Sequence, residues 1–223
     1  MPKPIYITVI VPYLLGSIPF GYLLVRMFRG EDIRKSGSGN IGATNVARSG
    51  SKILAIATLV LDALKGYVAV MLAFIGENTG HLFSPVPTQT LSDMRSVREA
   101  LQYAYFAAAT AAFCAMIGHM FPIWLRFKGG KGVATAVGAF GAIAPRALVL
   151  VLVVFVIIVA VTRYVSLGSI VGAMIFPFAC WWLNRLTREP DVMLLIAASS
   201  LLIVVRHKDN IRRLLAGTEN RFR

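Results

Sequence analysis

Residues 127–135 (FKGGKGVAT) place two lysines and three glycines beside a run of small apolar residues near the middle of the chain. Glycines let the backbone turn so that several N–H groups point at one spot, and the following residues can start a helix. A helix N-terminus carries roughly half a positive charge, to which Lys128 and Lys131 add full charges. This lysine–glycine motif therefore predicts an anion site suited to phosphate. The nucleotide-binding P-loop is excluded, because Gly132 stands where that loop has Ser or Thr.

An N-terminal motif, residues 37–48 (GSGNIGATNVAR), and a C-terminal motif, residues 206–219 (RHKDNIRRLLAGTE), also combine cations with small hydroxyl or amide side chains. Simpler interpretations exist for all three motifs: turn chemistry, a linker whose lysines reach lipid headgroups, and a basic amphipathic helix on anionic lipid. Turn chemistry does not require so many amide and hydroxyl groups around Arg48. A surface helix does not explain His207 and Asn210. We therefore expect functional roles in all three motifs.

The elements that must position these motifs are membrane helices. Of the 223 residues, 57% are hydrophobic, and the mean hydropathy is +0.71. The apolar residues form solid runs of about 18 to 25 residues, enough to cross a hydrocarbon core roughly 30 Å thick. The net charge is +13, and the basic residues gather at the ends of these runs, which is typical of membrane topology rather than of nucleic-acid binding. We predict an all-α integral membrane protein that binds no nucleic acid.

About seven transmembrane helices are expected, with the N-terminus outside and the C-terminus in the cytoplasm. Their approximate ranges are 5–28, 53–75, 100–120, 132–144, 146–163, 166–183 and 192–205. The short helix before Pro145 is alternatively re-entrant, which leaves six spans and moves the C-terminus to the other side. Seven spans place nearly all the dense basic clusters on one face, which the positive-inside rule assigns to the cytoplasm. All three motifs then share that face.

The chain as a whole, residues 1–223, is predicted to form a single polytopic membrane domain. Its active-site loops on the cytoplasmic face are residues 29–52, 121–135 and 206–223. The opposite face receives a long loop of mixed charge, residues 76–99. We expect no cleaved signal peptide, because the first apolar run has no clear small-residue cleavage site.

A few other polar or aromatic residues stand out within the apolar runs. Asp62 and Lys65 are spaced to lie on one helical face, where a structural ion pair and a catalytic role are equally good interpretations. His119 ends a predicted span, and a helix-terminal role is the simplest one for it. Trp181 and Trp182 fit an aromatic belt at the outer membrane interface.

The three motifs, taken in order, resemble those of a known family. GSGN–GATN–R, FKGGKGVAT and RH–NI–RLL–GTE are similar to the motifs of the PlsY family, which are bacterial membrane glycerol-3-phosphate acyltransferases that use acyl-phosphate as the donor. The resemblance covers nearly the whole chain, with matching hydrophobic spacing. One departure is the loop at residues 76–99, which is longer than the family's compact connection and lies on the face away from the motifs.

This resemblance implies transfer of a fatty acyl group to the 1-hydroxyl of glycerol 3-phosphate, giving lysophosphatidic acid and phosphate in the first step of phospholipid synthesis. The expected partners are acyl-phosphate, glycerol 3-phosphate, the lipid bilayer and a soluble enzyme that produces acyl-phosphate. The expected location is the bacterial cytoplasmic (inner) membrane, with the acyl tail in a groove between spans. We expect no cofactor and no metal. An acyl-phosphate is an activated ester whose leaving group is a stable anion, so no enzyme nucleophile is strictly needed.

Motifs and resemblance together predict the site residues. The predicted catalytic residues are Ser38, Arg48, Lys131, His207 and Asn210. The predicted substrate- and phosphate-binding residues are Gly39, Asn40, Thr44, Asn45, Lys128, Gly129, Gly130, Gly132, Thr135, Arg213 and Glu219. Backbone N–H groups of the three glycines, with Lys131, are expected to hold one phosphate, and Arg48 to grip a phosphate with two hydrogen bonds. The N-terminal motif is expected to supply neutral donors.

Two groups are candidates for the general base that accepts the proton of the attacking hydroxyl. His207 has a suitable ordinary pKa, but no carboxylate at a recognisable spacing orients it. A phosphate oxygen of the bound substrate is the alternative, and we favour it slightly. None of the three histidines is followed by aspartate four residues later, so the histidine–aspartate dyad of other acyltransferases is not expected. A phosphate or organic-anion transporter and a non-catalytic scaffold for anionic lipid are the two other classes compatible with these residues.

Overall fold

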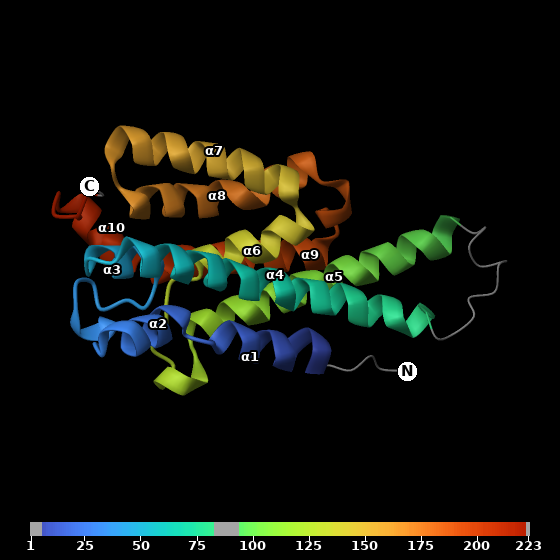
Figure 1. Cartoon of the computed structure of the whole chain (residues 1–223). Coiled ribbons are helices and arrows are strands. Elements are labelled where there is room, and N and C mark those ends of the chain that lie inside the picture. Colours follow the sequence, from blue (N-terminus) through green and yellow to red (C-terminus); the bar gives the residue numbers. More distant parts are fainter. Residues whose placement is uncertain (1–5, 83–93, 222–223) are drawn as a thin grey trace.

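The computed structural model describes residues 6–82 and 94–221, and the described residues form helices and loops without a β-strand (Figure 1). The α-helices are α1 (Val11–Ser17), α2 (Phe20–Arg29), α3 (Ala43–Arg48), α4 (Lys52–Leu82), α5 (Met94–Met120), α6 (Val133–Ile143), α7 (Pro145–Thr162), α8 (Val165–Leu183), α9 (Pro190–Arg206) and α10 (Lys208–Leu215). A helix satisfies its own backbone hydrogen bonds, which an apolar environment requires. The predicted all-α architecture is confirmed.

Five helical segments of the described chain are long and apolar enough to cross a membrane: Tyr6–Arg29, Lys52–Gly76, Val97–Leu125, Pro145–Thr162 and Val165–Leu183. A sixth candidate is the pair α9 and α10, which is bent by 55°. The helix α6 has only 11 residues, so it is about 16 Å long and covers about half of the hydrocarbon core. The count of seven spans and the orientation with the N-terminus outside therefore remain predictions.

The first candidate span is broken between α1 and α2. Pro19 has no N–H and cannot continue the helical hydrogen-bond ladder, so the chain leaves helical geometry at Ile18. The carbonyl of Ile18 is freed by this break and accepts a hydrogen bond of 2.8 Å from the Lys65 ammonium on α4. The break thus supplies a partner for a charged side chain inside the bundle.

The short helix α6 lies in the middle of the bundle. It packs against α4, α5 and α7, while α7 and α8 form an antiparallel pair along one side and α1, α4 and α5 lie on the other (Figure 1). Both α3 and α10 lie at the end of the bundle where the C-terminus is drawn. The N-terminus of α6 is therefore enclosed by neighbouring helices.

Two glycines set the spacing between α4 and α6, the most extensively packed helix pair. Gly138 on α6 faces the backbone of Ala63, and Gly66 on α4 faces the backbone of Thr135, both too closely for a Cβ atom. Small residues that let two backbones approach are the usual packing device of membrane helices. This contact fixes the position of α6 relative to the charged residues of α4.

We predict that Gly138→Ala destabilises the protein by about 1–3 kcal/mol, because the added methyl overlaps a backbone carbonyl that cannot move aside. The matched control is Gly141→Ala on the same helix. A Cβ there meets only the end of the Leu148 side chain, at 3.5 Å. Thermal unfolding in detergent, followed by circular dichroism, should show a lowered midpoint for Gly138→Ala alone. Equal midpoints for the two variants would contradict this packing.

Candidate active site

A polar cavity of about 170 Å³ lies where the three motifs meet. Among the predicted site residues, those that line it are Ser38, Asn40, Thr44, Asn45, Arg48, Lys131, Gly132, His207, Asn210 and Glu219. The predicted residues that do not line it are Gly39, Lys128, Gly129, Gly130, Thr135 and Arg213. Segments separated by up to about 180 positions in the sequence thus form one site, as the motifs predict.

Asn45 holds the N-terminal motif in shape. It is 2% exposed, and its side-chain oxygen accepts a hydrogen bond of 2.8 Å from the backbone N–H of Ser38. Its amide nitrogen donates to the carbonyls of Ile33, Ser36 and Asn40, at 2.8–3.2 Å. Both polar atoms of the side chain are therefore used by the loop backbone. Asn45, which the sequence predicts to be a neutral donor to substrate, thus has its side-chain nitrogen occupied by loop carbonyls in this structure.

The neighbouring residues of this motif bring free polar groups to the cavity. Gly39 supplies a left-handed turn with φ of +69°, and Asn40 closes the next turn by accepting a hydrogen bond of 2.9 Å from Gly42. No partner within the described chain is found for the hydroxyls of Ser38 and Thr44 or for the amide nitrogen of Asn40. These three side chains remain available as neutral donors.

Arg48, the last residue of α3, joins the N-terminal motif to the C-terminal tail. One guanidinium nitrogen donates to the carbonyl of Asn220 at 3.2 Å. Arg48 makes no ion pair with a described carboxylate, so its charge remains available to a ligand in the cavity that it lines. An arginine in this position can bind phosphate with two parallel hydrogen bonds.

The double glycine of the lysine–glycine motif is used differently from the sequence prediction. The N–H of Gly129 donates to the carbonyl of Met120 at 3.2 Å, and that of Gly130 to the carbonyl of His119 at 3.0 Å. Arg206 in turn donates to the carbonyls of both glycines, at 3.1–3.2 Å. Because both N–H groups already have acceptors, neither is free to donate to a phosphate in this structure.

The start of α6 provides free N–H groups instead. Gly132 has φ of +81°, a left-handed conformation that turns the chain directly into the helix. The first N–H groups of a helix have no acceptor within it, and here Val133 and Ala134 line the cavity. The positive end of the α6 dipole therefore faces the site, as the sequence predicts, with the anion contact shifted to the residues after Lys131.

The two lysines of the motif have different environments. Lys128 is exposed and lies outside the cavity lining. Lys131 is partly buried, lines the cavity and donates a short hydrogen bond to the side-chain oxygen of Asn210. Burial lowers the pKa of Lys131 to about 8, with Arg48 and Arg213 adding to the shift and Glu219 opposing it. At neutral pH Lys131 is still largely charged.

Glu219 connects the C-terminal motif to the rest of the site. It is 7% exposed, and its carboxylate accepts hydrogen bonds of 2.7–2.8 Å from Ser166, Asn210 and Arg213. Burial raises the pKa of this carboxyl group, but the three hydrogen bonds outweigh burial and leave the pKa below its ordinary value. The carboxylate is therefore charged, and it connects Ser166, Asn210 and Arg213.

His207 lines the cavity at the bend between α9 and α10. Its Nδ1 lies 2.7 Å from the carbonyl of Ile203, and since a carbonyl can only accept, Nδ1 must carry the proton. Burial lowers the pKa of His207 to about 4, and the charge of Lys131 adds to this shift. At neutral pH the ring is thus uncharged, with a lone pair on Nε2 that can accept a hydrogen bond.

A buried charged cluster on α4 and α5 lies beside the cavity. Asp62 and Lys65 form the ion pair that their spacing predicts, at 2.7 Å, and His119 Nδ1 lies 3.6 Å from the same carboxylate oxygen. All three side chains are less than 5% exposed, and Asp62 and His119 line the cavity. The ring of His119 also packs against Gly130, so its role extends beyond ending a helix. The cluster supports the lysine–glycine motif from within the bundle.

Three residues of the site were missed by sequence reasoning or left without a role. Ser166 and Ser169 on α8 line the cavity, and Arg206 holds the double glycine. The two serines are three residues apart in an apolar run, a spacing that places both hydroxyls on one helix face. This pattern in the sequence could have indicated their place in the site. The predicted residue Thr135 is fully buried and lies outside the cavity lining.

We predict that the Lys131 ammonium titrates with a midpoint near 8 and that Glu219→Gln moves this midpoint lower still. Burial favours the uncharged amine, while the Glu219 carboxylate favours the ammonium, so its removal takes away a stabilising charge. Nuclear magnetic resonance of ¹³C-labelled lysines measures the midpoint, and Lys131→Arg identifies the signal by its loss. A midpoint at the ordinary lysine value, or a rise in Glu219→Gln, would contradict this electrostatic description.

Comparison with known proteins agrees with this geometry. A family model described as glycerol-3-phosphate acyltransferase matches residues 6–217. A glycerol-3-phosphate acyltransferase of Rhodopseudomonas palustris is 44% identical over 222 residues, covering 98% of this chain and 96% of the relative. One of Agrobacterium fabrum is 41% identical over 221 residues, covering 99% and 93%.

Solved structures agree as well. The crystal structure of PlsY (YgiH), an integral membrane glycerol 3-phosphate acyltransferase, in its glycerol 3-phosphate form has a TM-score of 0.78 and 33% identity, covering 97% of this chain and 94% of that one. The lysophosphatidic acid form of the same protein has a TM-score of 0.75 and 32% identity over the same shares. With three motifs around one cationic cavity in a helical membrane bundle, the chain belongs to the PlsY family of integral membrane glycerol-3-phosphate acyltransferases.

Proposed function

We propose that this protein transfers a fatty acyl group from acyl-phosphate to the 1-hydroxyl of glycerol 3-phosphate, releasing lysophosphatidic acid and phosphate. The observation that carries the proposal is the joining of a cationic cavity to an apolar groove. The groove, of about 70 Å³, lies among α6, α7, α8 and α9 and shares Val133, Phe155 and Ser169 with the cavity. A substrate with a phosphate at one end and a hydrocarbon chain at the other fits this arrangement.

Each part of the cavity has a role in this reaction. The α6 N-terminus and Lys131 bind one phosphate, and Arg48 binds a second, since both substrates carry one. Ser38, Asn40 and Thr44 donate hydrogen bonds to phosphate oxygens or to the carbonyl oxygen as it gains charge. Such a donor is worth about 3 kcal/mol in related chemistry. The acyl chain lies in the groove, with its carbonyl where groove and cavity meet.

An acyl-phosphate donor suits these residues because its chemistry needs little from the protein. The glycerol hydroxyl oxygen attacks the acyl carbonyl, a new C–O bond forms, and the bond from the carbonyl carbon to the phosphate oxygen breaks. The leaving group is phosphate, a stable anion that the Lys131 charge and helix dipole stabilise. No covalent acyl-enzyme intermediate is required, because the phosphate can leave directly as the hydroxyl attacks.

The proton of the attacking hydroxyl goes to a phosphate oxygen of the substrate. A phosphate monoester has a second pKa of about 6, whereas burial lowers the pKa of His207 to about 4. Burial thus leaves His207 a weaker base than an ordinary imidazole, whereas the substrate brings its own phosphate dianion. His207 also has a backbone carbonyl on Nδ1 where a histidine–aspartate dyad has a carboxylate. We infer that His207 accepts a substrate hydrogen bond and that catalysis is substrate-assisted.

The location follows from the charge distribution. The motifs carry most of the dense basic clusters, and the positive-inside rule assigns them to the cytoplasmic face of the bacterial inner membrane. We propose a single polytopic domain with this orientation. A soluble enzyme that makes acyl-phosphate would be a suitable partner there, because the donor is reactive and poorly soluble. Basic residues such as Arg212 are exposed and could attract an acidic surface.

The direct test of the proposed function is turnover by the full chain in lipid, given glycerol 3-phosphate with either palmitoyl-phosphate or palmitoyl-CoA. We expect equimolar phosphate and lysophosphatidic acid only with palmitoyl-phosphate. Lys131→Met should lower turnover by about 10- to 100-fold, because a charged hydrogen bond to phosphate is lost. Lys128→Met is the matched control and should keep it. Turnover with the thioester, or equal effects of the two lysine variants, would contradict the proposal.

The role of His207 has its own test. We expect His207→Gln to retain more than about a tenth of kcat, because glutamine can still accept a hydrogen bond and loss of a true general base costs 10²- to 10⁴-fold. The Michaelis constant for glycerol 3-phosphate should rise at the same time. A loss of several orders of magnitude in kcat with unchanged substrate binding would instead assign the proton to the histidine.

A further inference from the structure

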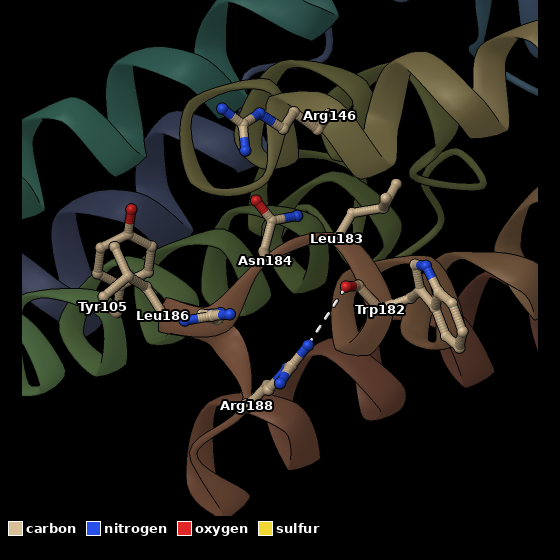
Figure 2. Close-up of a pocket in the computed structure, with 8 residues that line it drawn as sticks. Tyr105, Arg146, Trp182, Leu183, Asn184, Leu186 and Arg188 are labelled. Carbon is tan, nitrogen blue, oxygen red and sulfur yellow. Dashed lines mark hydrogen bonds between the residues drawn. The ribbon is translucent and has the colours of Figure 1, made fainter.

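A second cavity opens at the end of the bundle away from the active site. Its volume is about 420 Å³, within the usual range of ligand sites, and larger than that of the active-site cavity. It is lined by Tyr105 of α5, Arg146 at the start of α7, residues 182–186 and Arg188, where α8 ends and the chain turns towards α9 (Figure 2). None of these residues belongs to the three motifs. The acyltransferase reaction therefore leaves this cavity without a role.

This cavity is positively charged, because three arginines line it. Arg188 is occupied, because it donates to the carbonyls of Trp181 and Trp182 at 2.7 and 3.3 Å and so caps the end of α8 (Figure 2). Arg146 and Arg185 are exposed, and neither forms a hydrogen bond or ion pair with any residue that the structure describes. No carboxylate lines the cavity. Two guanidinium groups are thus free to bind an anion.

The lining also contains a neutral hydrogen-bond donor that has no acceptor within the described chain. The amide nitrogen of Asn184 is shielded from solvent and has no partner in the described chain. A shielded donor without a partner is unfavourable, and an oxygen-rich ligand in the cavity would satisfy it. Glu189, a carboxylate in the segment that follows Arg188, lies outside the lining and already pairs with Gln102, at 2.5 Å, and with Arg98. Arginines and an unpaired amide together match a phosphate group.

The surroundings of the cavity are those of the membrane interface. Trp181 and Trp182 are 55% and 79% exposed, and tryptophans of this kind gather at the level of lipid headgroups. Met174, Phe178 and Trp182 are spaced by four residues, so they lie on one face of α8, and all are exposed. This apolar stripe runs from the cavity towards the middle of the span. It offers a surface for hydrocarbon chains directly below a cationic cavity.

We propose that this cavity binds the phosphodiester headgroup of an anionic phospholipid from the leaflet at this end of the bundle. Arg146 and Arg185 hold the phosphate, Asn184 donates to one of its oxygens, and the acyl chains lie along the stripe on α8. A free phosphate shares the anion chemistry but would make no use of the stripe. The lipid is therefore the ligand to which both the charges and the apolar surface correspond.

The test uses the full chain purified in a neutral detergent, with binding of phosphatidylglycerol and phosphatidylcholine counted by native mass spectrometry. The double variant Arg146→Gln/Arg185→Gln should lose about 25-fold in affinity for phosphatidylglycerol, or about fivefold for each basic residue near an anionic lipid. Phosphatidylcholine binding should not change. Arg98→Gln is the matched control, since Arg98 is 77% exposed at the same end but outside the lining, and it should bind as the wild type does.

Three outcomes would overturn the proposal: equal affinity of the wild type for the two lipids, an equal loss in Arg98→Gln, or inorganic phosphate competing as well as phosphatidylglycerol does. The last would mark a site for a small phosphate rather than a lipid. If the double variant does not fold, Asn184→Asp provides a second test. It replaces the shielded donor by a negative charge, and selective loss of phosphatidylglycerol binding is again the expected result.

Discussion

The buried carboxylate of Glu219 is the interaction on which the active-site geometry depends. It receives hydrogen bonds from α8 through Ser166 and from α10 through Asn210 and Arg213. Asn210 also accepts a hydrogen bond from Lys131, which connects the lysine–glycine motif to the same carboxylate. A buried charge is tolerated only when it is paired and hydrogen-bonded, so the chain must bring these segments together. The position of the lysine–glycine motif relative to the C-terminal motif follows from this requirement.

The short helix α6 explains how an anion site can lie beside an apolar groove. A half-length helix begins inside the bundle, so its N-terminal N–H groups and dipole face a cavity between neighbouring helices. Gly66 and Gly138 hold it against α4, and Arg206 holds the double glycine that precedes it. The same helix forms one wall of the groove. One element therefore serves the phosphate at its start and the acyl chain along its side.

Much of the fold and of the site could be predicted from the sequence. Solid apolar runs specify membrane helices, the spacing of Asp62 and Lys65 predicts their ion pair, and the three motifs identify the cavity. Individual roles within the motifs were harder to predict. Residue type alone does not show that the Asn45 amide donates hydrogen bonds to its own loop, or that the Gly129 N–H donates to a carbonyl of α5. Predicting which groups are hydrogen-bonded requires the tertiary positions of both donor and acceptor. The contribution of Ser166 from a distant apolar helix depends on the same information.

Glu219 connects α8 with α10 and, through Asn210, with the lysine–glycine motif. Hydrogen–deuterium exchange in Glu219→Gln tests this connection most directly. The matched control is Glu31→Gln, which removes an exposed carboxylate that pairs with Arg29. Faster exchange is expected in α10 and in the lysine–glycine motif of Glu219→Gln, with α7 unchanged, and no change is expected in the control. Unchanged exchange in both segments of Glu219→Gln would contradict it.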